Sequence, residues 1–131
     1  MGKQSRDKGK RYEQFLARLF REYGYDAKRH LEFQGEEAEE GRDLDGTYPF
    51  AIQAKCWKSA PPITVLETVT TTEAYPIRLA ILKRSSVSKK PLEVVVMDLS
   101  TFMEMILAIE EGIMNGELPE GTWSKIIEES M

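Results

Sequence analysis

Four polar residues between Gly41 and Lys58 have the types and the spacing to do chemistry. Asp43 and Asp45 lie two residues apart, and Gln53 and Lys55 repeat that spacing in a stretch that is otherwise apolar. Side chains two apart on a strand share one face, so each pair points the same way. Carboxylate and amide oxygens are ligands that Mg²⁺ prefers. An ammonium beside them would place positive charge next to a phosphate or an attacking water.

A plainer interpretation of the same residues stays open. Polar residues alternate with apolar ones on any strand that has one side in water, and aspartates beside glycines often only form a turn. The spacing alone is compatible with either interpretation.

The segment itself predicts two strands that position these residues. A short strand is expected near Arg42 to Thr47, then a turn at Tyr48 and Pro49, then a strand from Phe50 to Trp57. The two should pair as a hairpin, which would bring the two polar pairs together. The expected core side of the second strand is Phe50, Ile52, Ala54 and Cys56, and the other side is Ala51, Gln53, Lys55 and Trp57.

A helix should cover this hairpin. Apolar residues three and four apart predict a helix from about Lys8 to Tyr23, with Gly24 as its C-terminal stop. Glu13 falls at the margin of the apolar stripe, so its carboxylate would lie where the helix meets the sheet. Residues 25–34 predict a strand, and residues 35–41 a solvated acidic loop.

The rest of the chain predicts further helices and strands. Residues 63–75 have helical spacing but contain five threonines, which lower helix propensity. Strands are expected at Ile77 to Lys83 and at Leu92 to Asp98. A helix from about Ser100 to Met114 should be capped by Ser100 or Thr101, with Glu104 at the capping-box distance. A short helix follows from Thr122 to Ser130. This order predicts an α/β fold, with a central sheet flanked by helices.

Composition narrows the kind of protein and the kind of site. A chain of 131 residues is long enough for one domain with a core, and it contains no apolar run of membrane-spanning length. We therefore expect a soluble, cytoplasmic protein without a membrane partner. One cysteine and one histidine exclude an internal disulfide, a cysteine-cluster zinc site and a His-pair metal motif. Any metal site must be built from oxygen. Cys56 and His30 are read as a buried small hydrophobe and a packed or surface histidine.

The charge is uneven along the chain. Net charge is −4, and residues 100–131 contain seven acidic residues against one base, Lys125. The first eleven residues are basic, with Asp7 as their one acid. Such a patch can bind phosphates, or it can be a solvated arm. Its bases are Lys3, Arg6, Lys8, Lys10 and Arg11.

The motifs together resemble the PD-(D/E)XK nuclease superfamily. The resemblance rests on a helix bearing Glu, then G-x-D, a short hairpin and an apolar strand ending in [E/Q]-x-K. Glu13, Asp43, Gln53 and Lys55 are the matching residues. Length and the basic start are similar to small Holliday junction resolvases and their phage relatives. The string IQAKCW also resembles Mrr-type restriction nucleases, in which Gln replaces the acidic residue.

This resemblance implies a fold and an activity. The fold would be a single nuclease-like domain, residues 1–131, with a restriction-endonuclease-like core and a flexible basic arm at 1–8. The activity would be Mg²⁺- or Mn²⁺-dependent hydrolysis of DNA, and the likeness to junction resolvases implies branched DNA during recombination as the substrate. The active form would be a homodimer. It would act in the cytoplasm, or in the host cytoplasm if the gene is from a phage.

The resemblance also implies roles for single residues. Asp43, Gln53 and the Ala54 carbonyl would hold the metal, with Asp45 as the alternative to Asp43. Lys55 would orient or deprotonate the attacking water, and Glu13 would position a second metal or a water. The DNA backbone would be bound by Lys3, Arg6, Lys8, Lys10 and Arg11.

Two functions of other classes remain. One is a noncatalytic DNA-binding or assembly module that keeps the nuclease fold while Gln53 marks a decayed site. The other is an interaction protein that uses its acidic C-terminal helices.

Overall fold

The computed structural model describes residues 3–31, 42–57, 61–84 and 90–130. The chain divides into two compact units, Met1–Met97 and Asp98–Met131, where the sequence predicts one nuclease-like domain. Among the described residues, no helix combines the length and the apolar character needed to cross a bilayer.

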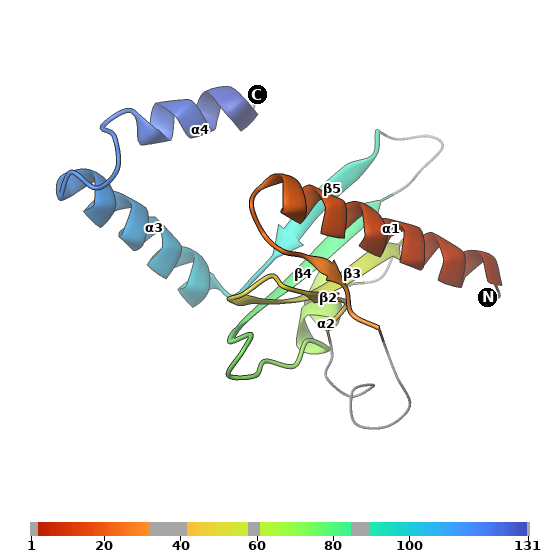
Figure 1. Ribbon diagram of the computed structural model, residues 1–131. Helices are drawn as coiled ribbons and strands as arrows, with labels where there is room; N and C mark the ends of the chain where they lie inside the picture. Colours follow the sequence, from red (N-terminus) through yellow and green to blue (C-terminus); the bar gives the residue numbers. More distant parts are fainter. Residues whose placement is uncertain (1–2, 32–41, 58–60, 85–89, 131) are drawn as a thin grey trace. The chain divides into compact units, whose positions relative to one another are not determined.

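The first unit is built around a mixed three-stranded sheet (Figure 1). Strand β3 runs parallel to β4, and β4 runs antiparallel to β5. A separate pair of two-residue strands, β1 and β2, is antiparallel. The elements of this unit are α1 (Lys3–Glu22), β1 (Lys28–Arg29), β2 (Leu44–Asp45), β3 (Phe50–Trp57), α2 (Pro62–Glu67), β4 (Ile77–Arg84) and β5 (Leu92–Val96).

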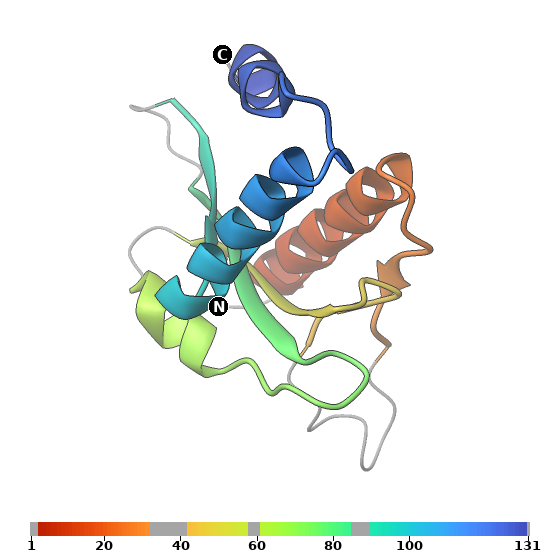
Figure 2. The same cartoon turned by 90° about the vertical axis from the view of Figure 1, so that its left-hand side faces the viewer.

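Helices lie on opposite faces of this sheet (Figure 2). Tyr12 and Leu16 of α1 pack with Ile52 and Ile81 into one core. Val65 and Leu66 of α2 pack with Ala80 and Leu82 into the other. We refer to these two sides as the α1 face and the α2 face. The α/β class and the sheet between helices are therefore confirmed.

Strand β3 has the expected bounds and the expected alternation. Ile52 is fully buried, and Phe50, Ala54 and Cys56 pack against the α1-face core. On the other side, Ala51 is fully buried, Gln53 is half-buried and Lys55 is exposed. The side chain of Trp57 lies outside the described residues.

The predicted hairpin is only partly correct. Strand β2 forms its ladder with β1, not with β3. Two backbone hydrogen bonds still join the segments: Asp43 N–H donates to the Ile52 carbonyl, and Phe50 N–H donates to the Thr47 carbonyl. Both short strands are shorter than predicted, and residues 32–41 lie outside the described part. The turn between β2 and β3 contains a cis Tyr48–Pro49 peptide bond.

Two helix boundaries of unit one differ from the sequence prediction. Helix α1 begins at Lys3, so residues 3–8 are helical where a flexible arm was expected. Helix α2 ends at Glu67, well before Tyr75. The Thr68 hydroxyl donates to the Val65 carbonyl at 2.6 Å, and such side-chain bonds compete with helix continuation.

The second unit consists of α3 (Leu99–Met114) and α4 (Thr122–Ser130), close to the predicted ranges. The predicted capping box is wrong. Asp98 occupies the N-cap position without a side-chain cap bond, so Ser100 and Thr101 fall inside the first turn. Leu118 packs over Gly112, where an added Cβ would come within 2.7 Å of a leucine methyl.

Candidate functional site

Asp43 lies against the edge of β3. Its N–H donates to the Ile52 carbonyl at 2.7 Å, and its carboxylate Oδ2 accepts from the Ala54 N–H at 2.8 Å. The N–H and C=O of one strand residue point to the same side of the strand, so the Ala54 carbonyl points to this edge as well. The structure thus brings Asp43 to the backbone between Gln53 and Lys55.

Gln53 and Lys55 themselves lie on the α2 face. Gln53 is in register with Ala80 and Lys55 with Leu82, both of which belong to the core under α2. Lys55 is exposed and Gln53 is half-buried. The ammonium is therefore open to solvent at the rim of that core.

Asp45 is bound by two nitrogen-bearing side chains. His30 Nδ1 lies 3.0 Å from both carboxylate oxygens, and Arg42 Nε donates to Oδ1 at 2.8 Å. An ionised carboxylate only accepts, so Nδ1 carries the shared proton. Burial raises the pKa of Asp45, but the hydrogen bonds and charges of His30 and Arg42 outweigh it, and the net pKa lies below its ordinary value.

The same group of residues fixes the turn after β2. The Arg42 guanidinium carbon lies 4.4 Å from the centre of the Tyr75 ring. The Tyr75 hydroxyl accepts from the Gly46 N–H at 3.0 Å. Asp45 therefore belongs to a network that joins β1, β2 and the segment before β4.

Glu13 is paired elsewhere. Its carboxylate accepts from Arg29 Nε at 3.0 Å. Arg29 is the register partner of Leu44, which belongs to the core under α1, so this pair lies on the α1 face. Asp43 and Asp45 flank Leu44 in sequence and therefore point to the opposite face. The structure does not bring Glu13 to the aspartates.

Metal binding at this site depends on which oxygen atoms are placed to act as ligands. Among the described residues, no three His, Cys, Asp or Glu side chains are grouped as a metal site. The donors at the edge of β3 are the Asp43 carboxylate, the Gln53 amide and the Ala54 carbonyl. Mg²⁺ is commonly held by one or two carboxylates with waters and substrate phosphates, so this set fits a weak site that a phosphate completes.

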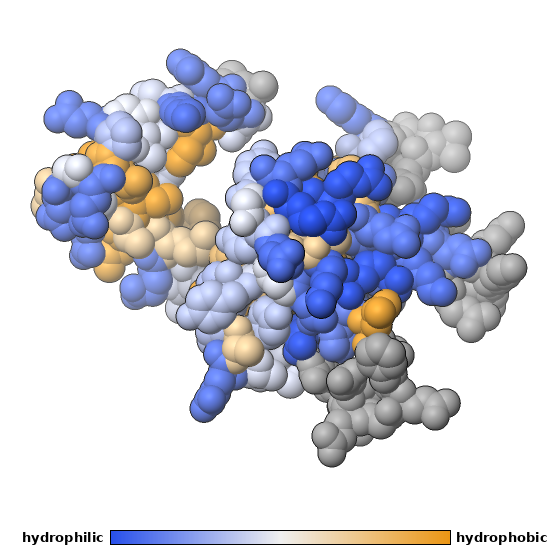
Figure 3. Space-filling model, in the orientation of Figure 1, coloured by the Kyte–Doolittle hydropathy of each residue, from blue (hydrophilic) through white to orange (hydrophobic). Residues whose placement is uncertain are grey.

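The basic N-terminal residues are carried on α1. Lys8, Lys10 and Arg11 are exposed on the helix, and hydrophilic residues cover the face of α1 seen in Figure 3. The side chains of Lys3 and Arg6 lie outside the described residues. Because α1 is already helical there, the bases are fixed to a rigid element.

Sequence reasoning missed the partners of Asp45. His30 is only 9% exposed, in keeping with a packed histidine, but its bond to Asp45 was not foreseen. That bond depends on the register of β1 against β2, in which Lys28 lies opposite Asp45. The one available signal was the expected strand at residues 25–34, in which Lys28, His30 and Glu32 share a face.

Comparison with known proteins adds no assignment: no family model matches the chain, and no curated protein or solved structure is significantly similar to it.

Proposed function

We propose that this protein is a divalent-metal-dependent DNA endonuclease whose site is formed by Asp43, Gln53, Ala54 and Lys55. The observation that carries the proposal is the bond from the Ala54 N–H to the Asp43 carboxylate, which sets an anion beside the Gln53–Lys55 stretch. The resemblance to PD-(D/E)XK nucleases, with their restriction-endonuclease-like core, supports the same residues. Branched DNA and a homodimer are part of the proposal.

Each residue has a role that follows from its chemistry. The Asp43 carboxylate, the Gln53 amide and the Ala54 carbonyl would hold Mg²⁺ or Mn²⁺. The bound ion would offset phosphate charge and make water a stronger nucleophile. The exposed Lys55 ammonium would bind a nonbridging phosphate oxygen and stabilise charge that builds on the phosphorane.

Asp45 and Glu13 receive other roles than the resemblance implies. Asp45 pairs with Arg42 and bonds to His30, and Glu13 pairs with Arg29. We take Asp43 as the metal ligand of the two aspartates because its carboxylate lies at the Ala54 N–H, beside Gln53 and Lys55. Asp45 is proposed to hold β2 in place, and Glu13 to attach α1 to β1.

The pairing of these two carboxylates also favours a second candidate. A site that has a glutamine in place of an acid, and from which Glu13 and Asp45 are absent, could bind DNA without cutting it, as a noncatalytic DNA-binding or assembly module. Cleavage with Mg²⁺ or Mn²⁺ separates this candidate from the first.

The test is cleavage of a labelled mobile junction and a linear duplex in Mg²⁺, Mn²⁺ and EDTA. Asp43→Asn keeps an acceptor for the Ala54 N–H but removes the anion, so cutting should fall by about 100-fold or more while DNA binding persists. Lys55→Ala should do likewise. Gln53→Glu should retain or increase cutting because it adds charge to the metal ligands.

Lys90→Ala is the matched control for Lys55→Ala, because both lysines are exposed in the same unit. Circular dichroism checks the fold of each variant. Light scattering on the same samples tests the homodimer against the chain mass of 15.0 kDa. Cutting by Asp43→Asn and Lys55→Ala at the wild-type rate would refute the proposed site.

A further inference from the structure

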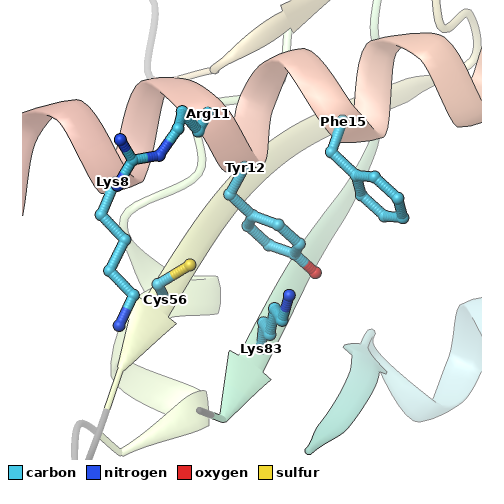
Figure 4. A pocket seen from close by; sticks show the side chains of 6 residues that line it. All are labelled: Lys8, Arg11, Tyr12, Phe15, Cys56 and Lys83. Carbon is cyan, nitrogen blue, oxygen red and sulfur yellow. The ribbon is translucent and has the colours of Figure 1, made fainter.

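A second polar feature lies on the α1 face, away from Asp43 and Lys55. It is a pocket of about 300 Å³ between α1 and the carboxyl ends of β3 and β4. Figure 4 shows its lining, in which Tyr12 points from the helix toward Lys83, and Cys56 points up from β3. The lining residues are Lys8, Arg11, Tyr12, Phe15, Cys56 and Lys83.

The sheet register builds the floor of this pocket. Cys56 lies opposite Lys83, and Lys83 lies opposite Glu93, so the three form a row across β3, β4 and β5. Residues in such a row share one face. In an open sheet with parallel strands, the carboxyl ends are where ligands usually bind.

Helix α1 builds the other wall. Lys8 and Arg11 are three residues apart, which puts them on neighbouring turns of one helix side. Tyr12 and Phe15 have the same spacing, and their rings stack with centroids 6.2 Å apart. Phe15 remains 41% exposed although it is a large apolar ring.

The charges in the pocket favour an anion. Within the described part of the chain, no carboxylate forms an ion pair with Lys8, Arg11 or Lys83. Lys83 Nζ lies 5.8 Å from the centre of the Tyr12 ring, a cation–π contact that leaves its three N–H donors available. Three cationic residues thus line one pocket, and no carboxylate is among its lining residues.

Glu93 lies beside the pocket, opposite Lys83, and its carboxylate already accepts a hydrogen bond. The Tyr12 hydroxyl donates to Glu93 Oε2 at 2.9 Å. Burial raises the pKa of Tyr12, and the bond and the charge of Glu93 raise it further, so the hydroxyl stays a donor at neutral pH. Burial also raises the pKa of the Cys56 thiol, against the opposing effect of Lys8 and Lys83. The thiol therefore adds no negative charge.

We propose that this pocket binds one phosphate group of a nucleic-acid strand, held by Lys8, Arg11 and Lys83, with the sugar or base beside it on Phe15. Lysine and arginine bind phosphates through charge-assisted hydrogen bonds. An exposed ring beside such a site is the usual platform for a nucleotide, which distinguishes a strand from free phosphate. This inference rests on the proposed function, because that function makes a nucleic-acid strand the occupant. Binding in the pocket does not involve the site at Asp43.

Cys56 provides the measurement, because it lines the pocket and is the sole cysteine of the chain. Its alkylation rate by iodoacetamide is followed in EDTA with no ligand, with inorganic phosphate and with a single-stranded oligonucleotide. The oligonucleotide should slow alkylation of the wild type. Lys8→Gln and Arg11→Gln, both at exposed positions, and Lys83→Met should each need about tenfold more oligonucleotide for the same protection.

Each variant is compared with its own ligand-free rate, because Lys8 and Lys83 also affect the thiol pKa. Lys90→Gln removes one positive charge outside the pocket and should be protected like the wild type.

Three results would overturn the inference. The first is that the oligonucleotide does not slow alkylation. The second is that inorganic phosphate, without any oligonucleotide, slows it. The third is that the oligonucleotide protects Lys8→Gln, Arg11→Gln and Lys83→Met as fully as the wild type. None of them depends on whether the protein cuts DNA, so a failure here is distinct from a failure of the proposed function.

Discussion

Asp45 shows how a candidate ligand can be a structural residue instead. Its carboxylate accepts from Arg42 and bonds to His30, and the Arg42 side chain is only 12% exposed, so loss of the charge would remove an anion from a mostly buried guanidinium. Weakening the pairing of a buried charged donor costs stability. At this scale, Asp43 and Asp45 differ in their partners, the β3 backbone for one and Arg42 with His30 for the other, although their sequence context is nearly the same.

Asp45 should therefore make stability depend on acid. Its pKa in the folded protein lies below the ordinary value, so the ionised form stabilises the fold above the unfolded pKa of about 4, and this stabilisation is lost as pH falls through the folded pKa. Asp45→Asn should lower the free energy of unfolding at pH 7 by about 1–3 kcal/mol. In this variant the free energy of unfolding should also fall less as the pH is lowered. Urea unfolding across a pH series measures both effects.

Glu67→Gln is the control for this pH series, because it removes an exposed carboxylate from α2. It should leave stability at pH 7 nearly unchanged. A wild-type acid profile in Asp45→Asn would show that the network around Asp45 adds nothing to stability.

At the scale of elements, the turn after β2 depends on one glycine. Gly46 has φ +77°, and a Cβ at this position would lie 1.9 Å from the carbonyl oxygen of Asp26. Its N–H is also bonded to Tyr75. The close approach of two backbones here sets the position of β2, and with it Asp43.

Gly46→Ala should therefore lower the free energy of unfolding by about 2–4 kcal/mol, through backbone strain and the clash with Asp26. Gly9→Ala is the matched comparison, since no atom lies within 4 Å of the added Cβ and the residue is inside α1. It should raise stability by about 0.5–1 kcal/mol. Equal urea midpoints for Gly46→Ala and the wild type would contradict the clash.

The elements also show where sequence patterns suffice. Period-two alternation predicted β3 and both of its faces, because α1 covers the side that carries Phe50, Ile52, Ala54 and Cys56. The pairing of β2 could not be predicted in the same way. Its ladder partner β1 is a distant segment of two residues, and alternation says nothing about which strand lies alongside. Helix α2 ends where the Thr68 hydroxyl donates to the Val65 carbonyl, and helix propensity alone does not predict such a bond.

Candidate residues followed the same division. Asp43 lies against the β3 backbone between Gln53 and Lys55, because neighbouring segments of the chain carry these residues. Glu13 does not lie with them, because its place at the margin of the α1 stripe does not fix which cation it meets. The pocket at Cys56 was missed since it needs Lys8 of α1 and Lys83 of β4 together.

At the scale of the whole molecule, charge is divided between the two units. Residues 1–97 contain 17 basic and 14 acidic residues, and residues 98–131 contain one basic and eight acidic residues. The uneven charge was visible in the sequence, but the boundary between the two units was not predicted, because only Met97 and Asp98 separate β5 from α3. The net charge of −4 therefore hides a basic first unit.

That division predicts how DNA binding responds to salt. Each phosphate that a protein neutralises contributes a slope of about −0.9 to the dependence of log affinity on log salt for duplex DNA. Neutralising the five bases at the start of α1 should flatten this slope and weaken binding to junction and linear DNA by a similar factor, because phosphate contacts carry no structural preference. Fluorescence anisotropy at a series of salt concentrations measures both. The variant changes Lys3, Arg6, Lys8, Lys10 and Arg11 to Gln.

The control changes acidic residues of the second unit, Glu128→Gln and Glu129→Gln, which are exposed on α4. Charges that do not touch phosphate release no counterions, and screening limits their reach to a Debye length of about 8 Å at physiological ionic strength. This variant should therefore keep the wild-type slope. If the slope of the five-base variant also stays at the wild-type value, the bases of α1 are solvated charges that do not contact DNA, and the proposed phosphate contacts of this helix are refuted.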